Sequence, residues 1–524
     1  MESPADKRIA IPSLTHQEQN ALDVLVKQWR AKRPRNNIRS AFYDMKNSET
    51  HLMAQTVPAV VRRRRFVLGW SSIAVDKLNR RCNLERFYDA GGIDLDELGL
   101  GDLARWNRLG QEVSQAGVSS LIHAVSFLVT TQGDTEAGEP PVLINTRDAS
   151  TSTGVWDVRR RALTSFLSIT DMDDRGEPTG MVMYLPNLNV IMTKAAGWTV
   201  DRRDHDYGLP VDPLRYKPRA GRPFGSSRIT RTVMSIHEQA LAAMIRADVN
   251  GEAYSLPRYV LLGATEEAFR NADGSPKSTW QAAWDAVWAI GDDSDAEGNL
   301  ARADVKQFSG QSPEPQNAHL RMLAQQFSGE TGIPIGELGI IGDANPTSAE
   351  ALLVSRDDLI SEAEQTMDGW SVDLSSAVTR ALQMLGDVPP NLDVRPQWRN
   401  PVNLSRAAAA DSGSKIIANA PWLADTEVGL ELLGLSEDQI RRALVEKRRL
   451  AGRAALAGLV PAAGDASEAS DVKAKADAMG VLIRSGASPE TAAAAVGLGG
   501  LQFTGAVPVS LRMPEAEAVG LEDQ

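Results

Sequence analysis

Residues 317–385 restrict the fold of this chain more than any other segment. Apolar residues recur there at the spacing of one helix face, up to the sequence Gly-Ile-Pro at residues 332–334. A loop rich in glycine and proline follows, and a second helical pattern begins near residue 348 and runs to residue 385. This second helix would measure about 55 Å at 1.5 Å per residue, provided that Gly369 does not break it. Two helices joined by a loop, without a catalytic motif, predict moving parts and no chemistry.

The bulk composition is that of an ordinary soluble protein. The 524 residues are enough for roughly three domains, with 42% hydrophobic and 24% charged residues. We find no run of about 18 apolar residues, so we expect neither a membrane span nor a cleavable signal. Cys82 is the single cysteine, which excludes an intrachain disulfide and a thiolate metal cage and favours a reducing cytoplasm.

The charge balance predicts that the chain does not clamp DNA tightly. It carries 56 basic and 68 acidic residues, a net charge of −12. Proteins that hold phosphates usually have a basic excess. Basic runs occur at 30–35 and 62–65, and the second could contact phosphates. A solvated helix face is the interpretation we favour for it. An acidic chain can still lie close to DNA without adhering to it.

The first 227 residues predict a mixed α and β region. Helical spacing is found at residues 17–29 and 103–116. Residues 171–180 predict a hairpin loop; a calcium site there is rejected because Val182 stands where a bidentate Glu is required. Strand patterns follow the helices at residues 125–130, 141–145, 163–170, 181–184 and 190–193.

Two helices flank a compact insert in the middle of the chain. A helical pattern covers residues 229–244, and strands are predicted at 258–262 and 305–308, on either side of the insert 263–316. Within the insert, three tryptophans lie on one helix face, where they would stack on bases or, as we favour, belong to a core or a subunit interface. They are Trp280, Trp284 and Trp288.

The C-terminal region, 386–524, is rich in alanine and predicts helices. A connector is expected at 398–404 and a flexible linker at 457–471. The helical patterns lie at residues 405–419, 426–433, 436–455 and 472–497.

No catalytic, metal or cofactor site is predicted. The phosphate-binding pattern G-x-x-x-x-G-K-[ST] and the nucleophile pattern G-x-S-x-G are both missing. The six histidines are scattered, and Leu241 stands where a zinc-protease motif beginning at His237 would need its second histidine. An enzyme is therefore unsupported, and we expect no cofactor.

The order of these elements resembles that of the portal proteins of tailed double-stranded-DNA phages, of the siphophage and actinobacteriophage type. Residues 57–81 (VPAVVRRRRFVLGWSSIAVDKLNRR) are similar to the N-terminal part of such portals, and residues 224–241 to their first stem helix. Residues 331–352 (TGIPIGELGIIGDANPTSAEAL) are similar to the segment that joins second stem helix, tunnel loop and tunnel helix. Residues 478–514 resemble the tail of actinobacteriophage portals.

This resemblance implies an α+β, helix-rich portal fold, assembled as a ring of normally twelve subunits at one capsid vertex. Double-stranded DNA would pass through the ring during packaging by a terminase and during later ejection. The implied parts are the wing (1–227), stem helix 1 (228–257), the clip (258–316), stem helix 2 (317–335), the tunnel loop (336–348), the long tunnel helix (349–385) and the C-terminal crown and tail (386–524).

Two sets of residues are candidates for contact with DNA. In the tunnel loop the glycines supply freedom of movement, while the two isoleucines line the constriction, contact neighbouring loops or pack on the subunit's own wing. On the first stem helix, three arginines would touch DNA phosphates or form ordinary ion pairs between subunits. The candidates are Gly339, Ile340, Ile341, Gly342, Asp343 and Asn345 in the loop, and Arg228, Arg231 and Arg246 on the stem.

The partners implied are further copies of the chain, the terminase large subunit, a head–tail adaptor, the major capsid protein and a scaffold, with no membrane. The protein would be assembled in the host cytoplasm and reside in the virion. Two alternatives are another structural ring protein of the virion head and a nucleic-acid-processing enzyme. The stem–insert–stem–loop–long-helix order distinguishes a portal from the first alternative, since a head–tail adaptor is too short to contain it, and the second alternative would need a metal or nucleotide site that we do not find.

Overall fold

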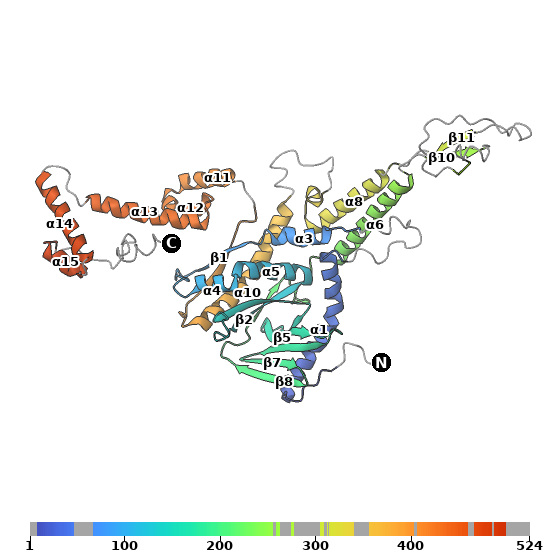
Figure 1. Cartoon of the computed structure of the whole chain (residues 1–524), viewed down its shortest axis with the longest axis horizontal. Helices are drawn as coiled ribbons and strands as arrows, with labels where there is room; N and C mark the ends of the chain where they lie inside the picture. The colour runs from blue at the N-terminus through green and yellow to red at the C-terminus, as the bar shows by residue number, and fades with distance from the viewer. Residues whose placement is uncertain are drawn as a thin grey trace, which may run out of the picture. The chain divides into compact units, whose positions relative to one another are not determined.

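The structure, a computed structural model, describes residues 8–46, 66–254, 258–262, 274–276, 304–308, 312, 314–339, 356–402, 406–458, 466–484 and 487–498. The chain forms two compact units, Met1–Asn403 and Leu404–Gln524. The first unit combines sheets and helices, which agrees with the predicted α+β class, and the second is helical where it is described (Figure 1).

Two antiparallel sheets form the centre of the first unit. The larger has the order β4-β5-β6-β7-β8, and the smaller has the order β3-β2-β9. Strands β2, β3, β5, β6 and β7 confirm the prediction, whereas β8 is mostly exposed and so shows no clear apolar alternation in the sequence. The strands are β2 (Val125–Gln132), β3 (Val142–Asp148), β4 (Ser152–Asp157), β5 (Ala162–Met172), β6 (Pro178–Leu185), β7 (Leu188–Lys194), β8 (Trp198–Asp204) and β9 (Val211–Arg215).

Helix α1 (His16–Tyr43) packs on the larger sheet. Its first turn is fixed by a capping box between Thr15 and Glu18, which satisfies two otherwise unpaired backbone N–H groups. Its buried side chains, Trp29 among them, share a core with residues of β5, β6 and β7. The helix continues through Pro34, well beyond the predicted 17–29, and Arg33 donates to the carbonyl of Gly176 at 2.8 Å. Part of the basic run 30–35 thereby holds the β5–β6 hairpin loop, which confirms that predicted loop.

The second core of this unit lies around α10 (Asp357–Leu385), a helix that Gly369 does not interrupt, as the second helical pattern requires. The residues from 340 to 355, where this helix is predicted to begin, lie outside the described residues. Trp370 is fully buried at its middle and packs near α5 (Leu109–His123). The predicted helix at 103–116 is instead two helices, α4 (Leu100–Asn107) and α5, because Arg108 adopts a left-handed φ of 48° between them.

A pair of strands far apart in the sequence extends the first unit toward Asn403. β1 (Leu84–Asp89) pairs antiparallel with β12 (Val394–Trp398), and the Trp398 Nε1 group donates to Ser371 Oγ at 2.9 Å. The boundary expected at residue 386 is therefore too early. Residues 386–402, expected to belong to the C-terminal part, contain a strand of the first unit.

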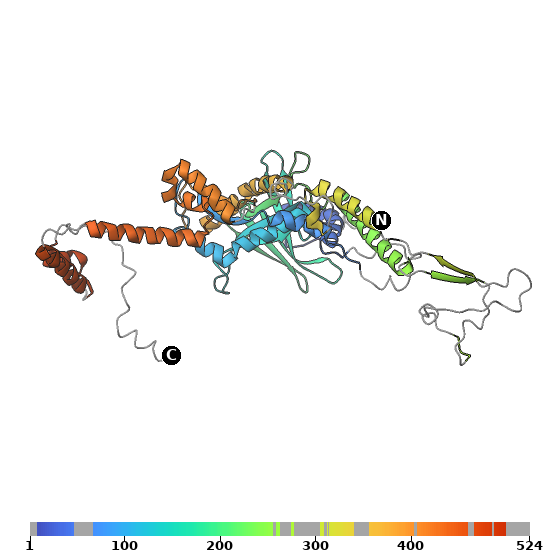
Figure 2. The same cartoon turned by 90° about the horizontal axis from the view of Figure 1, so that it is seen from above.

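Helices α6 (Arg231–Tyr254) and α8 (Glu314–Thr331) form an antiparallel pair (Figures 1 and 2). The pairing direction follows from a hydrogen bond of 2.9 Å from Thr230 Oγ1, just before α6, to Glu330 Oε1, near the end of α8. At the opposite ends, β10 (Arg258–Leu262) pairs with β11 (Asp304–Phe308). Both predicted helices and both predicted strands are confirmed here.

The second unit contains α11 (Arg406–Asn419), the 3-10 helix η4 (Pro421–Asp425), α12 (Glu427–Leu432), α13 (Glu437–Gly458), α14 (Ala466–Arg484) and α15 (Pro489–Ala495). The predicted linker is shorter than expected, because residues 466–471 are already part of α14. Within the part of the chain that is described, no helix is long and apolar enough to cross a membrane.

Candidate functional site

Arg228 joins the antiparallel helix pair to the body of the first unit. Its side chain is 5% exposed, at the start of the pair and next to α3 (Trp70–Asn79). The guanidinium donates to the carbonyl oxygens of Ala74 at 2.5 Å and Thr331 at 2.7 Å, and to Tyr216 Oη at 3.1 Å. It also forms a short ion pair with Glu362 of α10. One side chain therefore connects α3, the residue after β9, the end of α8 and α10.

Glu362 is held as a carboxylate by this arrangement. Burial opposes its ionisation, but the positive charge of Arg228 and hydrogen bonds from Lys217 and Tyr216 outweigh burial, so its pKa lies below the ordinary value. Burial in turn raises the pKa of Tyr216, whose hydroxyl donates to Glu362. We call these four residues, Arg228, Glu362, Tyr216 and Lys217, the Arg228 cluster.

A second charged cluster lies at both ends of the segment 340–355. Glu337, in the 3-10 helix η3 (Ile335–Leu338), pairs with Lys77 at 2.9 Å and with Arg356 at 2.8 Å. Arg356 is the N-cap residue of α10. Burial would raise the pKa of Glu337, but Lys77 and Arg356 together hold it below the ordinary value. These three residues, the loop-base cluster, join the beginning of the predicted tunnel loop (336–348) to α3 and to the N-cap of α10.

The charged groups of both clusters form ion pairs and hydrogen bonds within the chain. Among the described residues, no group of three or more His, Cys, Asp or Glu side chains could hold a metal ion. Ion pairs between helix ends position elements of the fold. The arrangement is that of a joint between a helix pair, a long helix and a loop.

Comparison with known proteins identifies the family of the chain. Residues 22–451 match the family model "Phage portal protein, SPP1 Gp6-like". The chain belongs to this family of phage portal proteins.

Two portal proteins of mycobacteriophages are similar over most of their length. The portal protein of Mycobacterium phage D29 is 24% identical over 456 residues, which cover 84% of this chain and 90% of the relative. That of Mycobacterium phage L5 is 24% identical over 394 residues, which cover 72% and 78%. A solved chain from the neck of a native gene transfer agent particle, computed with C12 symmetry, is 14% identical with a TM-score of 0.37, covering 70% of this chain and 89% of that one.

The predicted site residues of this portal protein differ in whether they are exposed or buried. Arg231 and Arg246 are exposed on α6, and Gly339 follows η3 with a left-handed φ of 78°. Arg228 differs from the expectation of DNA or intersubunit contact, because its guanidinium is buried and bonded within its own chain. The remaining candidates lie outside the described residues: Ile340, Ile341, Gly342, Asp343 and Asn345 in the loop, and Trp280, Trp284 and Trp288 in the insert.

Sequence reasoning missed Glu362, Glu337, Lys77 and Arg356. Glu362 is one of several acidic residues along α10 and has no local neighbour that distinguishes it. Its partner Arg228 is 134 positions away. Glu337 is one of two charged residues in the predicted loop 336–348, with Asp343, and nothing in the local sequence points to its partners Lys77 and Arg356.

A buried histidine on α6 of this portal protein allows the packing of α6 against α3 to be tested by pH. Burial lowers the pKa of His237 to about 4, and its Nδ1 lies 2.8 Å from Ser71 Oγ. The unfolded chain, with a histidine pKa near 6.5, therefore binds the extra proton between pH 6.5 and 4, so stability falls as pH falls through this window. The shift corresponds to a loss of about 3 kcal/mol in the free energy of unfolding.

We expect the His237→Asn variant to lose this part of the pH dependence, because it has no group that titrates there. Urea denaturation of both proteins at pH 7, 5.5 and 4 measures the difference, and the unassembled chain is used throughout. Parallel curves for the two proteins would show that His237 is not a buried neutral ring.

Proposed function

We propose that this portal protein forms the ring-shaped channel at one capsid vertex through which double-stranded DNA enters the head and later leaves it. The match of the portal family over residues 22–451 carries the proposal. The curated relatives, both named portal proteins, support it over most of their length. The ring would contain twelve copies of the chain and stand in the virion, after assembly in the host cytoplasm.

The proposed parts follow the elements of the fold. The antiparallel helices α6 and α8 would be the stem, and the strands β10 and β11 at its far end would begin the clip. The sheets with α1 would be the wing, α10 would be the long tunnel helix that also belongs to the wing, and residues 336–348 would be the tunnel loop. The second unit would be the crown and tail, with its boundary moved from residue 386 to Leu404.

The charge of the chain suits a channel along which DNA slides. A net charge of −12 on each subunit, repeated around a ring, disfavours adhesion of phosphates over the surface as a whole. Arg231 and Arg246, both exposed on the stem, would be restricted contact points or intersubunit ion-pair partners. The protein itself would perform no chemistry.

Other proteins would supply the remaining steps. The terminase large subunit would drive packaging from the clip side, and a head–tail adaptor would later replace it there. The major capsid protein and a scaffold would hold the wing during assembly of the head. Imaging of the purified chain in negative stain is the direct test: a ring with a central hole supports the proposal, and a compact monomer with nuclease activity overturns it.

Deletion of residues 339–344 is expected to leave ring assembly intact and to impair packaging or retention of DNA. The reason is that the Glu337–Arg356 contact and the wing contacts, which position the subunit, remain outside the deletion. DNA content of purified heads is the measurement, with ring formation checked by imaging.

A second variant separates loop length from loop side chains. Residues 340–344 are replaced by five glycine and serine residues, so the length stays constant while both isoleucines are lost. Loss of DNA in both variants assigns the effect to the side chains, and loss in the deletion alone assigns it to length. If heads assembled with the deletion variant contain as much DNA as wild-type heads, the tunnel-loop assignment is wrong.

A further inference from the structure

Helix α13 carries a concentrated positive charge in an otherwise acidic chain. Residues 441–453 contain six basic side chains and one acidic side chain, Glu446, whereas the whole chain has a net charge of −12. Five of the six basic residues are arginines. The basic residues are Arg441, Arg442, Lys447, Arg448, Arg449 and Arg453.

The five arginines lie on one side of the helix. At about 100° per residue, their positions fall within an arc of about 140°. Ile440, which is 3% exposed, lies on the opposite side of α13 and so marks the face that packs on the rest of the second unit. Lys447 also lies toward that side, where its Nζ contacts Asp425 Oδ1 at 2.6 Å. The lysine therefore lies on the side of Ile440, and the five arginines lie on the other side of the helix.

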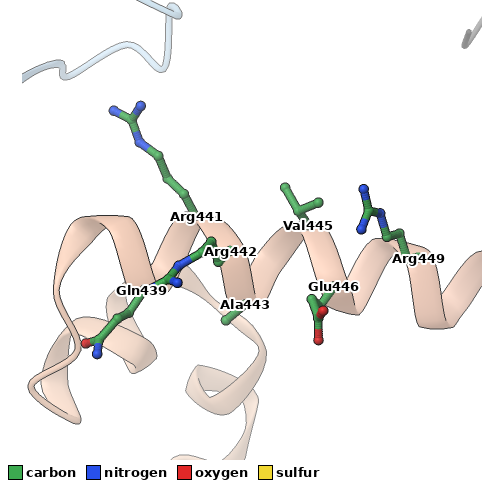
Figure 3. Close-up of a pocket in the computed structure, with 7 residues that line it drawn as sticks. All are labelled: Gln439, Arg441, Arg442, Ala443, Val445, Glu446 and Arg449. Carbon is green, nitrogen blue, oxygen red and sulfur yellow. The ribbon is translucent and has the colours of Figure 1, made fainter. Parts of the chain in front are cut away.

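The arginine face is open to solvent. All five arginines are exposed, as is Glu446 at the margin of the face. In Figure 3, Arg441, Val445 and Arg449 project toward the same side of the helix, and every residue that lines the concavity there comes from α13 itself. It is an open face along a helix and not an enclosed pocket, so it suits an extended partner better than a small molecule.

Duplex DNA is the partner that this face fits. From residue 441 to residue 453 the helix rises about 18 Å, over which duplex DNA presents about ten phosphate charges. Arginine offers a planar fork of N–H donors that matches a phosphate, and it is weakly hydrated compared with lysine. The arginines outnumber the acidic residues of α13, which are Glu437, Asp438 and Glu446, so the helix keeps a net positive charge that favours a line of phosphates.

We propose that the arginine face of α13, formed by Arg441, Arg442, Arg448, Arg449 and Arg453, binds the phosphate backbone of double-stranded DNA without sequence preference. The inference rests on the proposed channel function, because that function brings duplex DNA to the chain. It adds a site of adhesion in the second unit to a chain whose overall charge lets DNA slide. Guanidinium contacts to phosphate and the release of counterions supply the binding.

The test uses full-length rings and a covalently closed circular duplex, which a preformed ring cannot thread. Binding then reports surface contact alone. The variant Arg448→Gln/Arg449→Gln/Arg453→Gln removes three charges from the face and leaves the helix-forming tendency nearly unchanged. The matched control Arg159→Gln/Arg160→Gln/Arg161→Gln removes three exposed charges from the turn between β4 and β5. Negative-stain imaging confirms ring formation in each preparation.

For the α13 variant we expect binding to be weaker by roughly tenfold or more at 0.1 M salt, with the slope of log affinity against log salt smaller by about 3. The control should bind as the wild type does. Equal affinity and salt slope in the α13 variant and the control would overturn the inference while the rings leave the channel proposal standing. Unchanged DNA binding with failed incorporation into heads would also overturn it, by assigning the face to an acidic protein partner. A wild-type chain that forms no ring would instead refute the channel.

Discussion

Replacement of Arg228 by alanine is expected to lower the free energy of unfolding of the first unit by about 3–5 kcal/mol. The change removes the buried partner of Glu362 and leaves that carboxylate with Lys217 and Tyr216. It also removes donors to the carbonyl oxygens of Ala74 and Thr331. Ala74 lies within α3 and keeps its backbone partner in the helix, so the carbonyl of Thr331 at the end of α8 is more affected. The loss of the more deeply buried partner of Glu362 is added to the loss of this donor.

Urea denaturation of the unassembled chain measures this effect, and Arg231→Ala is the matched control. Arg231 stands three residues further along, at the start of α6, and is exposed. Its replacement should change the free energy of unfolding by no more than about 0.5 kcal/mol. A double-mutant cycle with Glu362→Gln then isolates the pair, and we expect a coupling energy of roughly 1 kcal/mol or more, because the two groups are in direct contact. Equal effects of Arg228→Ala and Arg231→Ala would show that the cluster does not hold the helix pair.

The substitution Gly225→Ala is the second change with a large expected effect, a loss of about 2–5 kcal/mol in the free energy of unfolding. Gly225 has a φ of 82°, a left-handed conformation that costs an L side chain energy. An added Cβ would also lie 2.1 Å from the carbonyl oxygen of Tyr216 and 3.1 Å from that of Ala124. Both obstacles are backbone atoms, so no side-chain rotation relieves the overlap.

A glycine-to-alanine substitution at Gly369 should change the free energy of unfolding in the opposite direction. Gly369 lies within α10, and an added Cβ there meets no atom within 4 Å. Because alanine favours a helix interior over glycine, Gly369→Ala is expected to stabilise the first unit by about 1 kcal/mol. Thermal and urea unfolding of the two variants side by side compare them. A Gly225→Ala protein as stable as wild type would show that the turn between β9 and α6 is not fixed as described.

The substitutions Arg228→Ala and Gly225→Ala both affect the connection between the helix pair and α10. Gly225 lets the chain turn back against Tyr216, and that turn delivers Arg228 to Glu362 three residues later. The helix pair, which is the proposed stem, is therefore attached to α10 through the Arg228–Glu362 ion pair. It is also attached to α3, through the contact of His237 with Ser71.

Much of the fold was predictable because its signals are local. The apolar periodicity of residues 317–331 and 229–244 corresponds to α8 and α6, and the strand patterns correspond to five strands of the two sheets. Elements with weak local signals were missed. Exposed β8 shows little alternation, and β12 lies mostly before the connector expected at 398–404, in a region where helices were expected.

The candidate site was less predictable for the same reason. Arg228 was singled out by its charge on a helical pattern, but charge alone does not say whether a side chain faces solvent or the interior. The loop residues Ile340 and Ile341 remain predictions. The arginines of α13 recur at helical spacing in the sequence. That their side of the helix is exposed follows only from the structure, where Ile440 and the Lys447–Asp425 contact lie on the other side.

The sequence by itself determined the main helices, five of the sheet strands, the acidic balance of the chain and the resemblance to portal proteins, because each depends on residues close together in the chain or on simple counts. The tertiary structure alone decided that β1 pairs with β12, that Arg228 is buried against Glu362 and that Glu337 joins Lys77 to Arg356. Pairing between distant residues depends on the path of the whole chain, since an ion pair has no period and leaves no local pattern to read.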